Sequence, residues 1–439
     1  MKRLMPLVLV CAVATAASAQ TTDTATSAQT PATTSSTQTP ATDAPPPTTT
    51  SRPRRQPPQT MTLMLSQSGA GAGDSEGLNP EAAALTGVHT DTDAMLTYQR
   101  NFRRGATLGF SGRTVVRYDA RAEDVTPMRE QGTIGFSTNG TTRQIRASQS
   151  VGYSPYYQFG AVPNLAPSAL DETALAHGDF VNSATSALTL STDAAVTQAI
   201  GRRSTLSLTY YSQRTTFDDS DLDQMSLWGS VAFSHRLSRN LSLRTGYSIR
   251  SARYPSSEME TLRLQGIDLG LDYSRALSLS RRTTFTFRSG GVVTKLVDGM
   301  TYVVTGDAAL TRMVGRTWNI RLAAKRDVNL LEGFTEPVLS NAITTGIGGG
   351  LNRRMSVSSS IAMSSGTVGV ARQANNEYWN WTAGAAWRLT LSRRSALDAQ
   401  YFYYGHRFDE AIVLPPGLLN QQIRQGLRIG VTWLIPVMQ

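Results

Sequence analysis

Cysteine is almost absent from this chain of 439 residues, and its single copy, Cys11, lies close to the N-terminus. Cys11 lies within an apolar run over residues 4–14. Two basic residues precede this run, and the small residues 17–19 follow it. This order is typical of a secretory signal peptide, which we predict over residues 1–19. Its removal leaves the mature chain without a thiol, a disulfide or a cysteine-built metal site.

Long apolar runs are also missing. After the predicted signal peptide, no stretch reaches the roughly 18 apolar residues that a membrane-spanning helix needs. A helical membrane anchor is thereby excluded. Of the two structures that can cross a bilayer, only a closed β-barrel remains compatible with the sequence.

Lysine is scarce in a chain that is otherwise basic. Of 42 basic residues only Lys2, Lys295 and Lys325 are lysines, and the formal net charge is +10. Such a charge can indicate a nucleic-acid partner. The arginines, however, stand singly or in pairs, with no dense tract interleaved with aromatic residues, so we expect no nucleic-acid binding.

Apolar side chains are nearly absent from residues 20–59, which are rich in Thr, Ser, Ala and Pro. Such a segment cannot bury enough apolar surface to fold, and we expect a disordered periplasmic arm. A mobile tether is the simplest interpretation. The alternative is contact of Arg52, Arg54 and Arg55 with an anionic partner such as cell-wall polymer or phospholipid.

From residue 60 onward the side chains alternate between apolar and polar. The clearest unit is residues 225–254, in which two alternating runs flank a polar turn at 238–240. Apolar Leu241, Leu243 and Tyr247 alternate there with polar Ser242 and Arg244. A period of two residues indicates a strand with one apolar face, and a polar face with unpaired arginines does not suit a sandwich core.

The connections between these strands predict a barrel. Eight short Arg-rich turns alternate with nine longer loops, which gives 17 connections and 18 strands. An even strand number places both chain ends at the short-turn side, as in single-chain bacterial barrels. We therefore predict an all-β protein whose residues 60–439 form an antiparallel transmembrane β-barrel, with a bulge near Gln265 and Gly266 where the apolar phase changes.

Tryptophans stand near the ends of several predicted strands. Such placement is typical of the aromatic girdles at the two membrane interfaces of outer-membrane barrels. The predicted girdle residues are Trp318, Trp379, Trp381, Trp387 and Trp433.

In this alternation and turn pattern the chain resembles the Gram-negative outer-membrane β-barrel superfamily, with a porin-like or exporter-like barrel. The resemblance implies an outer-membrane location and contact with outer-membrane lipid, lipopolysaccharide and the barrel assembly machinery. One feature differs from the superfamily: the chain ends Val437-Met438-Gln439, where such barrels commonly finish on an aromatic residue. This difference leaves the strand register at the closing seam open.

Acidic residues gather in the longer loops and arginines in the short turns. Carboxylate oxygens suit Ca²⁺ or Mg²⁺, which could bridge the loops to lipopolysaccharide phosphates. The candidate cluster is Asp218, Asp219, Asp221 and Asp223. Because it lacks a helix-loop context and a distal bidentate glutamate, a solvated loop tip is the preferred interpretation, and we expect neither a metal nor a cofactor.

Basic residues on the faces opposite the apolar stripes predict a net-positive lumen. Arginine and lysine rings favour anions. The alternative is that these residues pair with Asp268, Asp272, Asp307 and Asp398 and stiffen the wall. The predicted lumen residues are Arg244, Arg250, Arg263, Arg288, Arg321, Lys325, Arg388, Arg424 and Arg428.

Three functions fit this sequence. The preferred one is an outer-membrane pore for small solutes or polymers, narrowed by the long loop over residues 155–184. The second is a non-conducting structural or assembly component for surface polysaccharide or envelope architecture, with the loops and the arm as its working surfaces. The sequence leaves cell-wall and homo-oligomer contacts open. The third is a rim hydrolase using His406 with Asp409 or with Asp218 and Asp219. Because nothing in the residue spacing requires catalysis, we expect no enzyme.

Overall fold

The computed structural model describes residues 59–74, 87–102, 105–119, 124–155, 185–218, 223–255, 261–273, 275–276, 283–296, 299–331, 334, 336–369, 376–414 and 418–438. The predicted signal peptide, residues 20–58 of the predicted arm and residues 156–184 of the predicted constriction loop lie outside these ranges. Within the described residues, no helix is long and apolar enough to cross a membrane.

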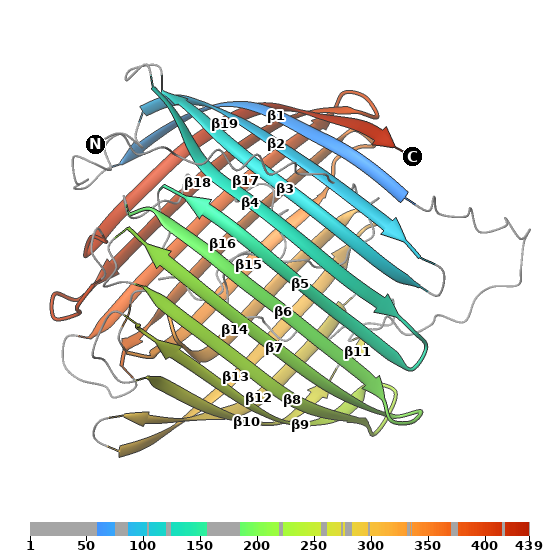
Figure 1. Cartoon of the computed structure of the whole chain (residues 1–439), viewed down its shortest axis with the longest axis vertical. Coiled ribbons are helices and arrows are strands. Elements are labelled where there is room, and N and C mark those ends of the chain that lie inside the picture. Colours follow the sequence, from blue (N-terminus) through green and yellow to red (C-terminus); the bar gives the residue numbers. More distant parts are fainter. Residues whose placement is uncertain are drawn as a thin grey trace, which may run out of the picture.

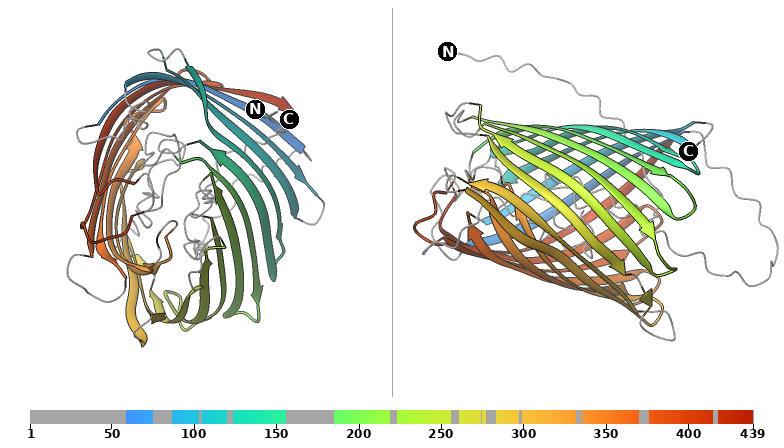
Figure 2. Two further views of the ribbon diagram at one scale, coloured as in Figure 1. Left: turned by 60° about the vertical axis from the view of Figure 1, so that its left-hand side comes forward. Right: turned by 90° about the horizontal axis from the view of Figure 1, so that it is seen from below.

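The described chain forms one closed antiparallel β-barrel, which confirms the predicted fold class (Figures 1 and 2). Each strand pairs with its sequence neighbours, and β1 closes the ring by pairing with both β2 and β19. The strands are β1 (Gln59–Asp74), β2 (Gly87–Asn101), β3 (Ala106–Asp119), β4 (Asp124–Asn139), β5 (Arg143–Ser154), β6 (Ala187–Ala199), β7 (Ser204–Phe217), β8 (Gln224–Arg236), β9 (Leu241–Arg253), β10 (Leu262–Tyr273), β11 (Arg275–Ala276), β12 (Thr283–Leu296), β13 (Gly299–Val314), β14 (Trp318–Asn329), β15 (Val338–Gly350), β16 (Met355–Val368), β17 (Glu377–Thr390), β18 (Ser395–Phe408) and β19 (Gln421–Met438).

These nineteen segments occupy eighteen positions around the ring, as predicted, because β10 and β11 follow one another alongside β12. Connections such as 237–240 and 351–354 define one end of the barrel, which we call the short-turn rim. The opposite end carries connections such as 330–337 and 409–420, and we call it the long-loop rim.

The strand β10 does not contain the predicted bulge. Its pairing with β9 is continuous from Leu262 to Tyr273. The irregularity lies on the β12 side, between the pairs Ile267 with Gly291 and Arg275 with Phe285. The change of apolar phase has another cause, since Leu264 faces the interior and is only 2% exposed. The prediction of a bulge near Gln265 and Gly266 is therefore wrong.

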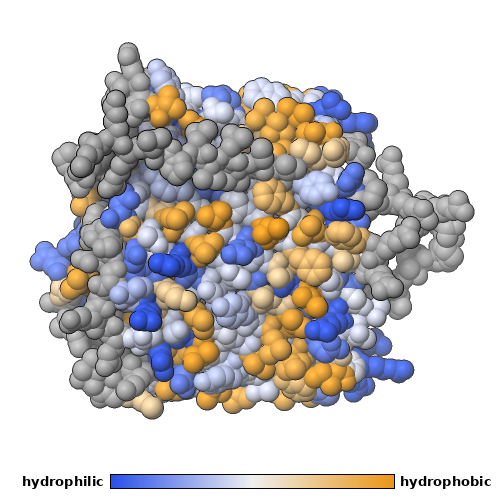
Figure 3. All heavy atoms as spheres, viewed as in Figure 1, coloured by the Kyte–Doolittle hydropathy of each residue, from blue (hydrophilic) through white to orange (hydrophobic). Residues whose placement is uncertain are grey.

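The outer wall of the barrel is apolar. Large apolar side chains at every second residue stay exposed, including Leu243 and Tyr247 on β9 and Ile361 and Met363 on β16. Figure 3 shows such side chains, in orange, gathered over the outer surface of the strands. Alternation therefore gives one apolar and one polar face, as a barrel in lipid requires.

The five predicted girdle tryptophans lie near the two rims. Trp318 opens β14, Trp387 lies near the end of β17, and Trp433 pairs with Ser395, which places all three at the short-turn rim. Trp379 and Trp381 lie near the long-loop rim. Trp381 packs over a glycine on the next strand, where a Cβ on Gly405 would lie 2.4 Å from the indole. Contact of these side chains with the membrane interface stays a prediction.

Candidate functional site: the inner wall of the barrel

A buried ion-pair cluster lies on the inner wall at the closing seam. Asp91 on β2 accepts two hydrogen bonds from Arg117 on β3, at 2.8 and 3.1 Å. The same carboxylate accepts one from Arg428 on β19, at 2.6 Å. His89 Nε2 lies 3.7 Å from it. We call these four residues the seam cluster, and Asp91 at its centre is 1% exposed.

The seam cluster bridges two strands that do not pair with each other. β1 lies between β2 and β19, and Ala70 on β1 pairs with both His89 and Arg428. Because β1 presents only small inner side chains here, such as Ser68 and Ala70, the Arg428 guanidinium reaches across it. The pairing of β1 with β19 sets the seam register from Thr62 with Pro436 to Asp74 with Arg424, with one register shift between Met61 and Thr62.

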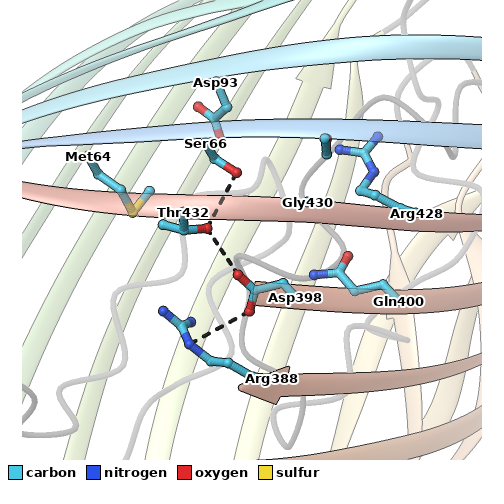
Figure 4. Close-up of a pocket in the computed structure, with 10 residues that line it drawn as sticks. Met64, Ser66, Asp93, Arg388, Asp398, Gln400, Arg428, Gly430 and Thr432 are labelled. Atoms are coloured by element: carbon cyan, nitrogen blue, oxygen red, sulfur yellow. Dashed lines mark hydrogen bonds and ion pairs between the residues drawn. The ribbon is translucent and has the colours of Figure 1, made fainter. Parts of the chain in front are cut away.

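A polar pocket adjoins the seam cluster on the inner wall (Figure 4). Asp398 on β18 accepts a hydrogen bond from Thr432 at 3.0 Å and lies 3.6 Å from Arg388 Nε. The Arg388 side chain remains 45% exposed, so it is only partly covered by its carboxylate partner. Asp93 closes another side of the pocket and binds Arg113 through two hydrogen bonds, at 3.0 and 2.7 Å.

A second group of ion pairs lies across β9 to β13. Arg244 Nε lies 2.9 Å from Asp268. Arg288 Nε lies 3.2 Å from Asp272 and 3.6 Å from Asp307. These contacts support the alternative that lumen arginines pair with aspartates, because three of the four predicted aspartate partners lie here and Asp398 is the fourth.

The predicted lumen residues do not all lie on the inner wall. Arg263 lies on the outer face, because it pairs with Ser251 and shares its face with the exposed Ile267 and Leu269. Its neighbours Leu262 and Leu264 occupy the inner face instead, so the assignment of Arg263 to the lumen is wrong. The structure places the others on the inner face: Arg244, Arg250, Arg288, Arg321, Lys325, Arg388, Arg424 and Arg428.

Two of these inner arginines are too buried to meet a solute directly. Arg424 is 1% exposed, and Arg428 is held in the seam cluster. Arg146 on β5, which the sequence did not single out, pairs with Asp193 at 3.2 Å and keeps 48% of its side chain exposed. Arg146 and Arg388 are therefore better placed than Arg424 and Arg428 to contact ions in the lumen.

Sequence reasoning also missed the acidic side of the seam cluster. Asp91 and Asp93 were not among the predicted lumen residues, but β2 begins at Gly87 and turns both inward. The signal was present in the sequence, since His89, Asp91 and Asp93 stand at every second residue and lead into the alternating part of β2. Their basic partners Arg113 and Arg117 follow the same period on β3.

Basic side chains outnumber acidic ones on the described inner wall. The basic residues are Arg113, Arg117, Arg129, Arg146, Arg244, Arg250, Arg288, Arg321, Lys325, Arg388, Arg424 and Arg428. The acidic residues are Asp91, Asp93, Asp119, Asp193, Asp268, Asp272, Asp307, Asp327 and Asp398.

The candidate acidic metal cluster has other contacts where it is described. Asp218 accepts a hydrogen bond from the Ser186 hydroxyl, and Asp223 accepts one from the Phe217 amide at 2.9 Å. Asp219 and Asp221 lie outside the described residues. Within the described ranges, no three His, Cys, Asp or Glu side chains gather in a way that could hold a metal ion.

His406 lies on the inner face of β18. Its side chain is fully buried, with hydrogen bonds at 2.9 Å to the Tyr404 hydroxyl and to the Leu419 carbonyl. Asp409 instead accepts a hydrogen bond from the Glu377 amide at 2.9 Å. These contacts give His406 a packing role, and the pairing of His406 with Asp409 stays a prediction.

Several solved structures are similar to this barrel. OpdL of Pseudomonas aeruginosa has a TM-score of 0.48 and 11% sequence identity, covering 87% of this chain and 99% of that one. OccK2 (OpdF) of the same organism, solved in complex with glucuronate, has a TM-score of 0.47 and 9% identity over 87% and 98% of the two chains. OccAB3 of Acinetobacter baumannii has a TM-score of 0.45 and 9% sequence identity, covering 86% of this chain and 99% of that one. Neither a protein-family model nor a curated protein matches the sequence.

Proposed function

We propose that this protein is a pore in the outer membrane of a Gram-negative bacterium, passing small solutes with a preference for anions. The observation that carries the proposal is the closed barrel with an apolar outer wall and a charged inner wall on which basic residues are in excess. A barrel of about 18 strands encloses an aqueous channel unless something fills it.

Anion preference would come from the half-exposed arginines. Arg146 pairs with Asp193 and Arg388 with Asp398, and each arginine keeps nearly half of its side chain exposed. A partly desolvated guanidinium attracts carboxylate or phosphate and raises the barrier for cations. The two arginines of the seam cluster share the Asp91 carboxylate and are almost fully buried, so they contribute mainly to the rigidity of the wall.

Current recording in planar bilayers tests the pore and its charge preference together. We expect measurable conductance and a reversal potential, under a KCl gradient, that reports chloride preference. Arg146→Gln combined with Arg388→Gln should lower the ratio of chloride to potassium permeability, because each substitution removes one lumen charge. Arg263→Gln is the matched control, since Arg263 lies on the outer face and its replacement should leave the ratio unchanged.

A non-conducting structural or assembly role is the second candidate. The observation that favours it is an apolar cluster of inner-wall and loop side chains at the long-loop rim. If the wild type and variants with a widened lumen all insert correctly but carry no current, this role is favoured over the pore. Contacts with lipopolysaccharide, cell-wall polymer, the assembly machinery or further copies of the chain belong to either proposal.

A further inference from the structure

The β14–β15 hairpin leaves the barrel wall at its end. β14 pairs with β15 as far as Asn329 with Val338, but with β13 only as far as Arg326 with Gly306. β13 itself continues to Gly299 alongside β12. Beyond Arg326 the hairpin has therefore separated from its neighbour. We call its described residues 327–331, 334 and 336–338 the hairpin tip.

The base of the hairpin tip packs against the inner face of the neighbouring strands β10 to β13. Val328 is fully buried in an apolar cluster with Leu264 on β10, Val292 on β12 and Val303 on β13. From β9, the Arg250 guanidinium donates a hydrogen bond to the Val328 carbonyl at 2.9 Å. Because Leu264 and Arg250 face the lumen, the tip that contacts them lies inside the barrel.

Charge pairing holds the same base in place. Asp327 is buried between Lys325 at 3.1 Å and Arg250 at 3.8 Å. Asp327 also accepts a hydrogen bond from the Val328 amide at 2.9 Å. The bent conformation of the tip is thus fixed by charge-assisted contacts as well as by apolar packing.

The end of the hairpin tip joins opposite walls of the barrel. Tyr254, which follows β9, donates a hydrogen bond from its hydroxyl to the Phe334 carbonyl. The Phe334 ring lies 5.8 Å, between ring centroids, from that of Phe408 at the end of β18. β9 occupies the ninth position in the ring and β18 the seventeenth, since β10 and β11 share one, and these positions are nearly opposite.

The surroundings of Phe334 are apolar. Phe334 is 1% exposed, and it belongs to a cluster that contains Phe217 from β7, Tyr378 from β17 and Leu418 from the connection before β19.

Burial raises the pKa of the Tyr254 phenol, so this hydroxyl stays protonated and remains a hydrogen-bond donor to Phe334. A narrow apolar stretch in a channel resists hydration, which stops ions from passing.

We infer that the hairpin tip is the segment that restricts passage through this lumen, with Phe334 as the narrowing side chain and the Tyr254 hydroxyl as the contact that holds it across the barrel. The inference rests on the proposed pore function. It assigns size selection to residues at the long-loop rim, whereas anion preference belongs to the arginines further along the inner wall.

Shortening the tip tests this inference. Replacing residues 330–337 by Asn-Gly leaves the pair Asn329 with Val338 joined by a two-residue turn suited to a β-hairpin. We expect single-channel conductance several-fold above that of the wild type, and passage of larger neutral sugars in liposome swelling. Equal conductance of both proteins would overturn the inference and leave the pore intact. Silence of both, despite insertion, would overturn the pore itself.

Single substitutions test the residues separately. Phe334→Ala should raise the conductance, and Tyr254→Phe should lengthen the open periods, because each removes one contact of the tip while keeping the chain length. Phe287→Ala is the matched control, since Phe287 lies on the exposed outer face. If Phe334→Ala conducts no more than Phe287→Ala, the assignment of Phe334 is overturned.

Discussion

Replacing Asp91 by alanine is expected to lower the free energy of unfolding of the barrel by about 3–5 kcal/mol, the usual cost of removing one partner of a buried ion pair. The substitution removes the carboxylate shared by Arg117 and Arg428, whose side chains are themselves almost fully buried. It also removes the contact that crosses β1 at the closing seam. Urea unfolding in detergent or lipid vesicles, followed by tryptophan fluorescence, measures the change.

The matched control for this prediction is Asp193→Ala. Asp193 pairs with Arg146 at 3.2 Å, but the arginine side chain is 48% exposed. Solvent-exposed ion pairs contribute roughly 0–1 kcal/mol, so the control should unfold almost as the wild type does. Equal losses of stability for the two variants would contradict the role given to the seam cluster.

Placing a charge in the middle of the outer wall should have a comparable effect. Ile361 lies halfway along β16 and is exposed on the outer face. For Ile361→Arg we expect a loss of about 2–4 kcal/mol, since a charged side chain at the bilayer midplane is costly. Unfolding from lipid vesicles, rather than from detergent, is the appropriate measurement because the bilayer has a defined thickness.

The control for this substitution is the same change at a position close to the membrane interface. Met355 begins β16 on the same face, beside the short-turn rim. Met355→Arg should cost only about 0–1 kcal/mol, because near the interface an arginine reaches the headgroups. A loss that does not depend on depth would show that the outer face of β16 is not in contact with lipid.

The fold was predictable from the sequence because barrel strands follow a local rule. Alternation in segments such as β9 and β19 is set by the two faces of each strand, and the turns are short enough to fix which strands are neighbours. Strand ends were less predictable. A single polar run such as residues 87–93 is compatible with either a loop or the lumen-facing end of a strand.

The inner wall was only partly predictable, for reasons visible at Arg263 and Arg424. Arg263 was assigned to the lumen because the apolar stripe was assumed to lie outside, but Leu264 packs inward against the hairpin tip. Arg424 was assigned correctly to the inner face, yet its burial depends on neighbouring strands that one strand's sequence does not describe. The inward bend of the hairpin tip likewise depends on contacts between residues far apart in the chain.

The most direct test of the account is spin-label accessibility along β9 in lipid vesicles. Because the predicted mature chain lacks cysteine, single labels can be placed at Leu243 and Tyr247 on the outer face and at Ser242 and Ser248 on the inner face. The account predicts that labels at 243 and 247 are more accessible to oxygen dissolved in the bilayer than labels at 242 and 248. Equal oxygen accessibility at all four positions would contradict a lipid-facing barrel. So would a mature protein that is soluble in buffer without detergent.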